Sequence, residues 1–435
     1  YLVINILEAP ILALILGYIT KYTRDDVFTF QDNINFPVFL FMSVVVAMFM
    51  GLTVSAEEIV RDRKILERES FLNLSWPAYL SSKIVYLFVF SAFQTFTFVL
   101  ITSLILDIKG MFLIYWLVLF STSAFANMIG LNISSGLDSV VAIYILVPLI
   151  LVPHLLLGGA MISFDDLNRG LTKKKYVPII GDIMITRWAY EAISVAQFKS
   201  NKFEQYFYDD EEKSNTAIYH NSFLIPDLRV KLQDCQRMLE EEDIVEDVLK
   251  KDLLIVSNEF KKLEANQNVP PFELISKLNE DSISIDILEE SLGYLMFLSL
   301  HFTELGSEAE LRKDHIYDSL RIVMGAEELI TFQENYYNNK LADIVTNRTG
   351  IRKIYETKKE LIQKYGPIFI MPTNRWGRAQ FFAPYKKLNH QIVETKWYNL
   401  VVIWMGVVML YFTLVLDGLR KLLTYFKNLR IAESE

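Results

Sequence analysis

The feature that most constrains this 435-residue chain is a set of apolar stretches, each about the length of a membrane helix. A helix needs roughly 20 mostly apolar residues to cross about 30 Å of hydrocarbon. Such stretches cover residues 1–20, 35–54, 84–106, 111–131, 140–161 and 398–419. The region between the last two carries the mixed charge of a soluble domain. We therefore expect an all-α membrane protein with six transmembrane helices and a large, mainly helical extracytoplasmic domain between spans five and six.

This pattern divides the chain into consecutive segments with different expected surroundings. The division is 1–162 for spans one to five, with a cytosolic connecting helix at 57–83 inside it, 163–205 for a re-entrant or interfacial element, 206–397 for the outer helical domain, 398–419 for the sixth span and 420–435 for a cytosolic tail.

Basic residues in the short flanks set the expected orientation, because such flanks stay in the cytosol. The segment 57–83 and the tail 420–435 are the basic ones. Both should be cytosolic, which places residues 163–397 outside. The lysines at 173–175 disagree with this assignment, but long translocated domains weaken the rule. We expect an integral protein of a bacterial inner membrane with a periplasmic domain.

Within the outer domain, apolar residues recur mostly at intervals of three or four, the spacing of amphipathic helices. The longest pattern runs over 226–263, with one six-residue gap across the acidic run 240–243, and predicts a helix of nearly forty residues. Further helical patterns cover 284–303, 308–345 and 350–364. The domain should therefore be mainly helical.

Several kinds of function are excluded by missing motifs. The sequence has no GxxxxGK[ST] phosphate loop, no HExxH zinc motif and no GxSxG nucleophile motif. A single cysteine rules out a cysteine-rich metal site, and a net charge of −9 argues against nucleic acid as a partner. We expect no catalytic residue, no metal and no cofactor in this segment.

A few polar side chains interrupt the apolar stretches. A charge at mid-membrane costs about 2.5–3.5 kcal/mol on insertion scales, so such groups should face protein or water. They are candidates either for a transport pathway or for hydrogen bonds between helices, and the sequence leaves both open. These candidates are Glu8, Gln94, Asn127 and Asn132.

The segment 57–83 reads EEIVRDRKILERESFLNLSWPAYLSSK, a charged amphipathic helix followed by a break and a return to the membrane. A solvated linker would not need Ile59, Ile65, Leu66 and Phe71 to gather on one side. We expect the first three of these residues to hold the helix against the spans, since such a helix lies on a membrane or on another protein.

This segment resembles the connecting and coupling helices between spans two and three of the G subfamily of ABC transporters, the white-like half-transporters. Two further regions are similar to the same family. Residues 123–162 resemble its fourth and fifth spans, and 185–198 (ITRWAYEAISVAQF) resembles the element after its re-entrant helices. The matching positions are Arg61, Arg63, Arg68, Glu69 and Tyr79 in the first segment, and Arg187, Trp188, Tyr190 and Glu191 in the last.

The resemblance implies the permease half of an ATP-driven exporter that moves a hydrophobic or amphipathic substrate by alternating access. Arg61, Arg63, Arg68 and Glu69 would then couple the spans to a nucleotide-binding ATPase domain, which carries ATP and Mg²⁺. That domain is expected on the same polypeptide, before Tyr1, or on a separate chain. Half-transporters of this type form homodimers. The long outer domain without cysteine pairs looks more like bacterial relatives than like the eukaryotic exporters.

A second function stays open on the same residues. In a mechanotransmission or scaffold protein, ATP-driven motion would move the outer helical domain against an extracytoplasmic partner, and little would cross the bilayer. The long amphipathic pattern at 226–263 favours that alternative.

Overall fold

The computed structural model describes residues 2–23, 27–69, 75–168, 170–172, 174–241, 245–267, 269–422 and 424–425. Contacts divide the chain into two compact units. Unit 1 comprises Tyr1–Lys202, Thr331–Ala342 and Pro372–Glu435. Unit 2 comprises Phe203–Ile330 and Asp343–Met371.

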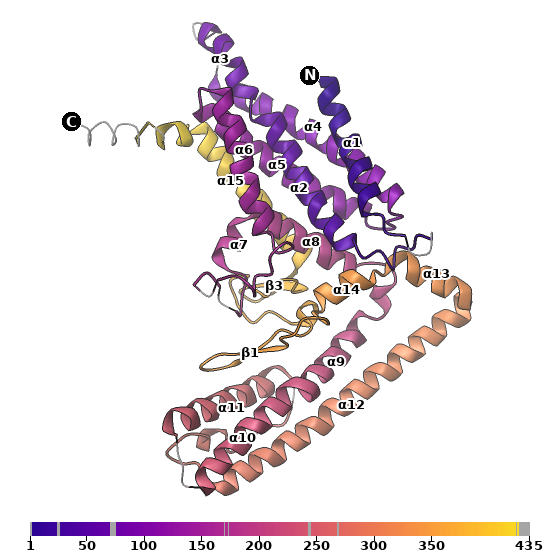
Figure 1. Ribbon diagram of the computed structural model, residues 1–435, viewed down its shortest axis with the longest axis vertical. Coiled ribbons are helices and arrows are strands. Elements are labelled where there is room, and N and C mark those ends of the chain that lie inside the picture. Colours follow the sequence, from indigo (N-terminus) through magenta and orange to yellow (C-terminus); the bar gives the residue numbers. More distant parts are fainter. Residues whose placement is uncertain are drawn as a thin grey trace, which may run out of the picture. The chain divides into compact units, whose positions relative to one another are not determined.

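Unit 1 is a bundle of apolar helices with a short cap of irregular chain. Its elements are α1 (Leu2–Thr20), α2 (Phe36–Ser55), α3 (Glu58–Glu69), α4 (Trp76–Ile105), α5 (Phe112–Gly136), α6 (Val140–Leu156), α7 (Ile179–Ile183), α8 (Ile185–Lys199), β3 (Tyr385–Leu388), β4 (Gln391–Glu394) and α15 (Thr395–Val415). Figure 1 shows α1, α2, α4, α5 and α6 running side by side, with α8 crossing one end of the bundle.

Four helices of the described residues are long and apolar enough to cross a membrane, namely α2 (continuing into α3), α4, α5 and α15. The apolar helices Ile4–Thr20 and Val140–Leu156 are shorter. All of these lie where the sequence predicts spans. The expected total of six spans stays a prediction for the two shorter helices.

The centre of the bundle is the contact between α2 and α5, the two most buried of the four long helices. Small residues bring these helices together. A Cβ added at Gly51 would lie 2.5 Å from the Ser123 carbonyl oxygen, and one added at Gly130 would overlap the Ser55 hydroxyl. Glycine therefore lets the two backbones approach, as small residues do in membrane helix pairs.

Two segments of the predicted outer domain, 331–342 and 372–394, belong to unit 1 by contact. The Asn338 side-chain amide donates to the carbonyl oxygens of Phe30 (2.8 Å) and Asn33 (3.0 Å), which fixes the segment 331–342 to the loop between α1 and α2. The segment 372–394 folds over α8 and ends in the hairpin of β3 and β4, in which Tyr385 pairs with Glu394. The boundaries of unit 2 thus differ from the expected domain at 206–397.

Unit 2 is mainly helical, with one short hairpin. Its elements are the 3₁₀ turn Glu204–Tyr206, α9 (Tyr208–Tyr219), the π-helical turn His220–Leu224, α10 (Ile225–Glu240), α11 (Glu246–Asn266), the 3₁₀ turn Ile275–Lys277, α12 (Ile285–Met324), β1 (Ile354–Glu356), β2 (Leu361–Gln363) and the 3₁₀ turn Pro367–Phe369. The helices α13 (Ala326–Tyr336) and α14 (Asn339–Val345) cross its boundaries with unit 1.

The core of unit 2 lies where α10, α11 and α12 meet, around Leu232, Phe260 and Leu298. The 40-residue α12, about 60 Å long at 1.5 Å per residue, runs beside α9 and α10 in Figure 1. It starts where the Ser284 hydroxyl accepts the Ile287 N–H and ends at Gly325, whose φ of 88° suits a glycine.

Two sequence predictions in this unit are wrong. The single helix predicted at 226–263 is two helices, α10 and α11, which pack against each other. The break falls at the six-residue gap, because a helix that offers no apolar residue to a core gains little there. The predicted helix at 350–364 is the hairpin of β1 and β2, with Ile354 opposite Gln363.

The hairpin has a local cause that periodicity alone does not reveal. The Thr357 hydroxyl accepts the N–H groups of Lys359 (3.3 Å) and Glu360 (3.0 Å), which fixes a tight turn. Ile354 and Ile362, β-branched residues on either side of that turn, suit short strands.

Candidate functional site

The helix α3, predicted to couple the spans to an ATPase, is fastened to the bundle at its first turn. The N–H groups of Ile59 and Val60 both donate to the Ser134 hydroxyl of α5, each at 3.0 Å. The first N–H groups of a helix have no partner within it, so this serine acts as a cap supplied by another helix. Ile59 itself is buried.

A cluster of ion pairs joins the same turn to the start of α4. The buried Glu58 carboxylate accepts from Arg61 (2.7 Å) and from Lys83 (2.8 Å). Lys83 also pairs with Asp62 at 2.7 Å, and the Tyr79 hydroxyl donates to Asp62 at 3.1 Å. Two carboxylates therefore face two cations, and the pairing holds α3 at a fixed angle to α4.

Arg63 binds the other neighbour of α3, the C-terminal end of α5. Its guanidinium forms an ion pair with Asp138 and donates to the carbonyl oxygens of Ser135 (3.2 Å) and Leu137 (3.3 Å). A cation at the end of a helix interacts favourably with the unpaired carbonyl groups there. Arg63 therefore attaches α3 to the C-terminal end of α5.

The second half of α3 is more exposed than the sequence suggests. Ile65 is 49% exposed, so the expectation that it holds the helix against the spans is wrong. The apolar contact comes from Ile59 instead, because the helix leaves the bundle surface after its first turns. Arg68 is exposed, and the side chain of Glu69 lies outside the described residues.

The polar residues predicted within the spans lie at contacts between helices. The Gln94 amide donates to the Asn5 carbonyl oxygen at 2.8 Å, and the Asn127 amide donates to the Ser91 hydroxyl at 2.7 Å. The Asn132 amide donates to the Leu410 carbonyl oxygen at 3.0 Å. These bonds link α4 to α1, α5 to α4 and α5 to α15. Glu8 lies half-buried on α1.

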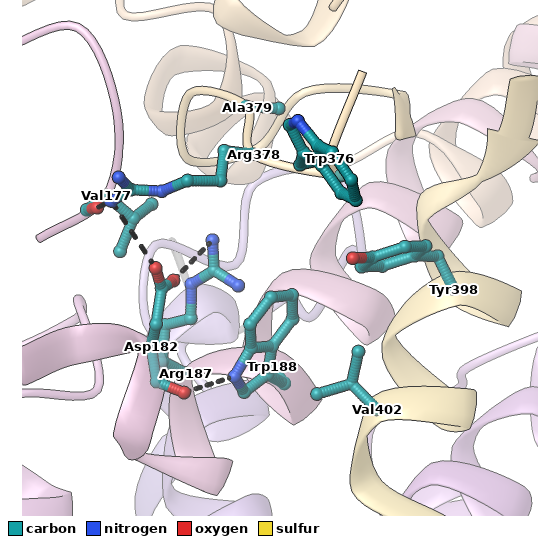
Figure 2. Close-up of a pocket in the computed structure, with 10 residues that line it drawn as sticks. Val177, Asp182, Arg187, Trp188, Trp376, Arg378, Ala379, Tyr398 and Val402 are labelled. Carbon is teal, nitrogen blue, oxygen red and sulfur yellow. Dashed lines mark hydrogen bonds and ion pairs between the residues drawn. The ribbon is translucent and has the colours of Figure 1, made fainter. Parts of the chain in front are cut away.

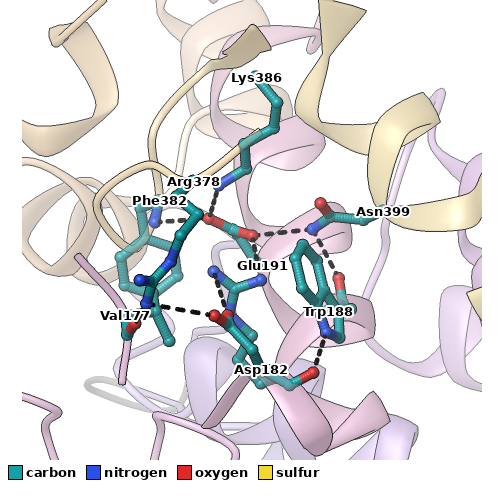
Figure 3. Close-up of polar contacts among 9 residues, drawn as sticks. Val177, Asp182, Trp188, Glu191, Arg378, Phe382, Lys386 and Asn399 are labelled. Carbon is teal, nitrogen blue, oxygen red and sulfur yellow. Dashed lines mark hydrogen bonds and ion pairs between the residues drawn. The ribbon is translucent and has the colours of Figure 1, made fainter. Parts of the chain in front are cut away.

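A second charged cluster lies at the end of the bundle that α8 crosses. Glu191, on α8, is fully buried. One of its oxygens accepts from the Lys386 ammonium (2.8 Å) and the Phe382 N–H (3.1 Å), and the other accepts from the Asn399 amide (2.9 Å). The Arg187 guanidinium lies 3.4 Å from the same carboxylate. Figure 3 shows these partners converging from α8, α15 and the segment 372–388.

The electrostatics of this cluster follow from burial and pairing. Burial alone would raise the pKa of the Glu191 carboxyl, but the charges of Arg187 and Lys386 and the hydrogen bonds from Lys386 and Asn399 outweigh it and lower that pKa. Burial lowers the pKa of the Lys386 ammonium, against the pull of Glu191. The pair is a charge-assisted contact that fixes the segment 372–388 to α8.

Beside this cluster lies a pocket of about 260 Å³, drawn in Figure 2. Its charged groups are Asp182, Arg187 and Arg378, and its aromatic walls are Trp188, Trp376 and Tyr398. The remaining lining residues are Val177, Gly377, Ala379 and Val402. The pocket thus combines ionic groups with flat apolar surfaces, a composition typical of small-ligand sites.

The pocket's charged groups are held by specific contacts. The Asp182 carboxylate lies 3.7 Å from Arg187 and 3.6 Å from Arg378. Arg378 also donates to the Val177 carbonyl oxygen at 2.8 Å. Burial raises the pKa of Asp182, although both arginines oppose that shift. The Arg187 guanidinium stacks on the Trp188 ring, 3.8 Å from its centre, as arginine often does on aromatic faces.

An apolar groove of about 600 Å³ lies on α5 and α15 in the same unit. Leu117, Trp397, Val401, Trp404, Met405 and Val408 are among its lining residues. The Trp404 indole donates to the Ser121 hydroxyl at 3.0 Å, which pairs these two polar groups of the groove. Such a surface suits hydrocarbon.

The sequence marked part of the α8 cluster and missed the rest. Arg187, Trp188 and Glu191 lie in it, while the predicted Tyr190 packs beside it against Phe41 (5.3 Å between ring centres). Their partners Asp182, Arg378, Lys386 and Asn399 were not predicted. A lone asparagine near the start of an apolar span was a usable signal for Asn399. Lys386 gave none, because it stands among other basic residues.

Apolar helices of membrane-crossing length, joined by buried polar bonds, define an integral membrane protein. Residues 1–198 match the model of the ABC-2 type transporter family. This match covers α1 to α8, and it supports an ABC-2 permease, the membrane-embedded part of an ABC transporter. ABC-2 permease domains typically pair with a nucleotide-binding ATPase. No curated protein is significantly similar to the chain.

Proposed function

We propose that this chain is the permease half of an ATP-driven ABC exporter of the G subfamily type, and that α3 carries motion from the ATPase to the spans. The match of residues 1–198 to ABC-2 permeases is the observation that carries the proposal. The exporter moves a hydrophobic or amphipathic substrate by alternating access, with two copies of the chain forming one pathway.

The attachment of α3 supports a coupling role. Its first turns are bonded to α5 through Ser134 and to α4 through Lys83. Arg63 adds hydrogen bonds to the end of α5. A push on the exposed half of α3, where Arg68 lies, would reach α4 and α5 through these bonds. Coupling between sites needs such contiguous, rigid connections.

In this proposal the residues divide into two roles. Arg68 faces the ATPase, Arg63 holds α3 to α5, and Arg61 pairs with Glu58 of α3, the carboxylate that Lys83 of α4 also binds. The chain has six spans with both ends in the cytosol, and residues 163–397 lie on the periplasmic side of a bacterial inner membrane. ATP and Mg²⁺ bind the ATPase.

Cross-linking tests the contact with the ATPase. Arg68→Cys, treated with a short bifunctional thiol–amine reagent in membranes, should join the ATPase. Arg321→Cys, at an exposed arginine of α12 in unit 2, is the matched control and should give no such product. The native Cys235 should not interfere, because it is buried, and burial first and nearby acids second raise its pKa to about 12. An adduct at neither position would refute the coupling role.

Because Cys235 is buried and unreactive, cysteine labelling can also test the orientation of the chain in the membrane. Lys250→Cys, at a well exposed position of α11, should react with a membrane-impermeant maleimide in intact cells. Ile65→Cys on α3 should react only after the membrane is permeabilised. Labelling of position 65 and not 250 from outside would overturn the proposed orientation.

One observation favours the mechanotransmission alternative. The 40-residue α12 exposes Ile322 (84%) and Val323 (83%), apolar residues at which an extracytoplasmic partner could bind. Purified protein with its ATPase in vesicles separates the two functions. ATP-dependent flux of an amphipathic dye supports the exporter, and ATP hydrolysis without any flux supports mechanotransmission.

A further inference from the structure

The pocket beside α8 holds an arginine whose hydrogen-bonding capacity is only partly used. Arg187 is 1% exposed, yet it lines the pocket. Within the part of the chain that the structure describes, its Nε and Nη1 atoms have no hydrogen-bond partner. The carboxylates nearest to it lie at 3.4 and 3.7 Å, beyond a short charge-assisted bond. Buried donors left unpaired are costly, so these atoms indicate a missing acceptor.

The charges around the pocket do not balance. Arg187, Lys386 and Arg378 contribute three positive charges, and Asp182 and Glu191 contribute two negative ones, so the group carries a net charge of +1. Lys386 lies on Glu191 at 2.8 Å and neutralises it. The excess therefore falls on the two arginines, which share the single carboxylate of Asp182 at 3.6 to 3.7 Å. One further anion would balance the cluster.

The walls of the pocket describe the rest of the ligand. Trp188 and Tyr398 stand 6.0 Å apart between ring centres, and the Trp376 ring, 84% exposed, lies at the open side. Figure 2 shows Trp376 and Tyr398 on the side of the pocket away from Asp182, while the Trp188 indole donates to the Asp182 carbonyl oxygen at 2.8 Å. Gly377, with a φ of 75°, carries the loop past the Tyr398 hydroxyl, where a Cβ would not fit. The rings offer flat apolar surface next to the two guanidinium groups.

We propose that this pocket binds a singly charged organic anion, a carboxylate or a phosphodiester, whose apolar part lies against Trp188, Trp376 and Tyr398. Arg187 and Arg378 hold the anionic group, since guanidinium forks match carboxylate and phosphate geometry. The volume of about 260 Å³ is slightly below the range of roughly 300–1,000 Å³ for drug-sized ligands, which limits the bound part to a small group.

A cation would fit the aromatic walls but not their surroundings. Aromatic faces attract ammonium groups, but positive charges close by repel them. Here two arginines line the same pocket, and the single carboxylate already lies between them. A cation would add a third positive charge to that group.

Binding measurements on the purified chain in phosphatidylcholine nanodiscs test the proposal. Two arms separate the two sources of such an anion. In the first, benzoate is titrated by calorimetry, with the neutral benzamide as its matched control. In the second, phosphatidylglycerol is added to the nanodiscs in graded fractions, and lipid retained by the protein is measured by native mass spectrometry.

The key variant is Arg378→Gln, which removes a partly exposed cation of the pocket, and its matched control is Arg375→Gln, an exposed arginine of the same loop that does not line the pocket. We expect saturable binding in at least one arm, weakened about tenfold or more in Arg378→Gln and unchanged in Arg375→Gln. Binding of benzoate assigns a free anion, and binding of phosphatidylglycerol assigns a lipid headgroup. No saturable binding in either arm, equal binding of benzamide, or full affinity in Arg378→Gln would overturn the proposal.

Discussion

Replacing Lys386 by methionine should destabilise unit 1 far more than a change at an ordinary lysine. Lys386 is buried on β3, and its ammonium lies 2.8 Å from a carboxylate oxygen of the fully buried Glu191 (Figure 3). Methionine keeps most of the volume of the side chain and removes only the charge and its donors. The substitution leaves Glu191 charged in the interior with fewer partners.

The magnitude follows from what remains around Glu191. After the change, Asn399, the Phe382 N–H and the more distant Arg187 still contact the carboxylate. Breaking a buried ion pair by removing one partner costs about 3–5 kcal/mol, because the other charge stays buried. The remaining contacts place the expected loss at the lower end, about 3 kcal/mol.

The assay is a double-mutant cycle in denaturant unfolding of the detergent-solubilised protein, followed by tryptophan fluorescence. Lys387→Met is the matched control, since Lys387 is the next residue of the strand and is only half-buried. Glu191→Gln keeps the shape of the side chain and most of its hydrogen bonds. The double variant should recover much of the loss, with a coupling of about 1–3 kcal/mol between the two residues.

Two outcomes would refute this reasoning. If Lys386→Met loses no more stability than Lys387→Met, the buried pair does not fix the segment 372–388 to α8. If the losses of the single variants simply add in the double variant, Lys386 and Glu191 do not interact, whatever their separate contributions.

Three further predictions concern other parts of the molecule. Gly130→Ala should destabilise unit 1 by about 1–3 kcal/mol in thermal unfolding, because its Cβ would overlap Ser55. Gly293→Ala, with open space around it, should be neutral or slightly stabilising in the same assay. Equal effects of the two substitutions would contradict the packing argument. Burial lowers the pKa of His220 to about 4 from 6.5, so the unfolded chain binds a proton that the folded chain excludes, and stability should fall by up to about 3 kcal/mol as pH drops from 6.5 through 4. Urea unfolding of wild type and His220→Gln measures this, and identical pH slopes would count against it. Residues 203–371 expressed alone should give a helical circular dichroism spectrum and unfold cooperatively, and a disordered spectrum would show that unit 2 depends on unit 1.

The long helices of unit 1 could be predicted because their cause is local. About twenty apolar residues in a row are costly in water and span a bilayer as a helix, so 35–54, 84–106, 111–131 and 398–419 correspond to α2, α4, α5 and α15. The charged helix within 57–83 could be predicted for the same reason, since its pattern of charge and hydrophobicity lies within one short segment. Its resemblance to coupling helices was readable from the same residues.

Predictions failed where the structure depends on a turn of only a few residues or on a contact between residues far apart in the sequence. The hairpin of β1 and β2 depends on a turn made by the Thr357 hydroxyl, a signal too brief for a periodicity that averages over several turns of helix. The exposure of Ile65 depends on where α3 leaves the bundle, which is set by Ser134, 75 residues from Ile59.

The sequence by itself determined the class of protein, the places of the long helices and several of the residues on α3 and α8, because length, hydropathy and charge act within one segment. Only the tertiary structure decided what those residues do. Arg63 attaches α3 to the end of α5 through Asp138, 75 residues away in the sequence. Glu191 binds Lys386, which is 195 residues away. The pocket beside α8 forms because charged residues that are distant in the sequence lie together at one end of the bundle. A local sequence pattern cannot predict contacts between distant segments.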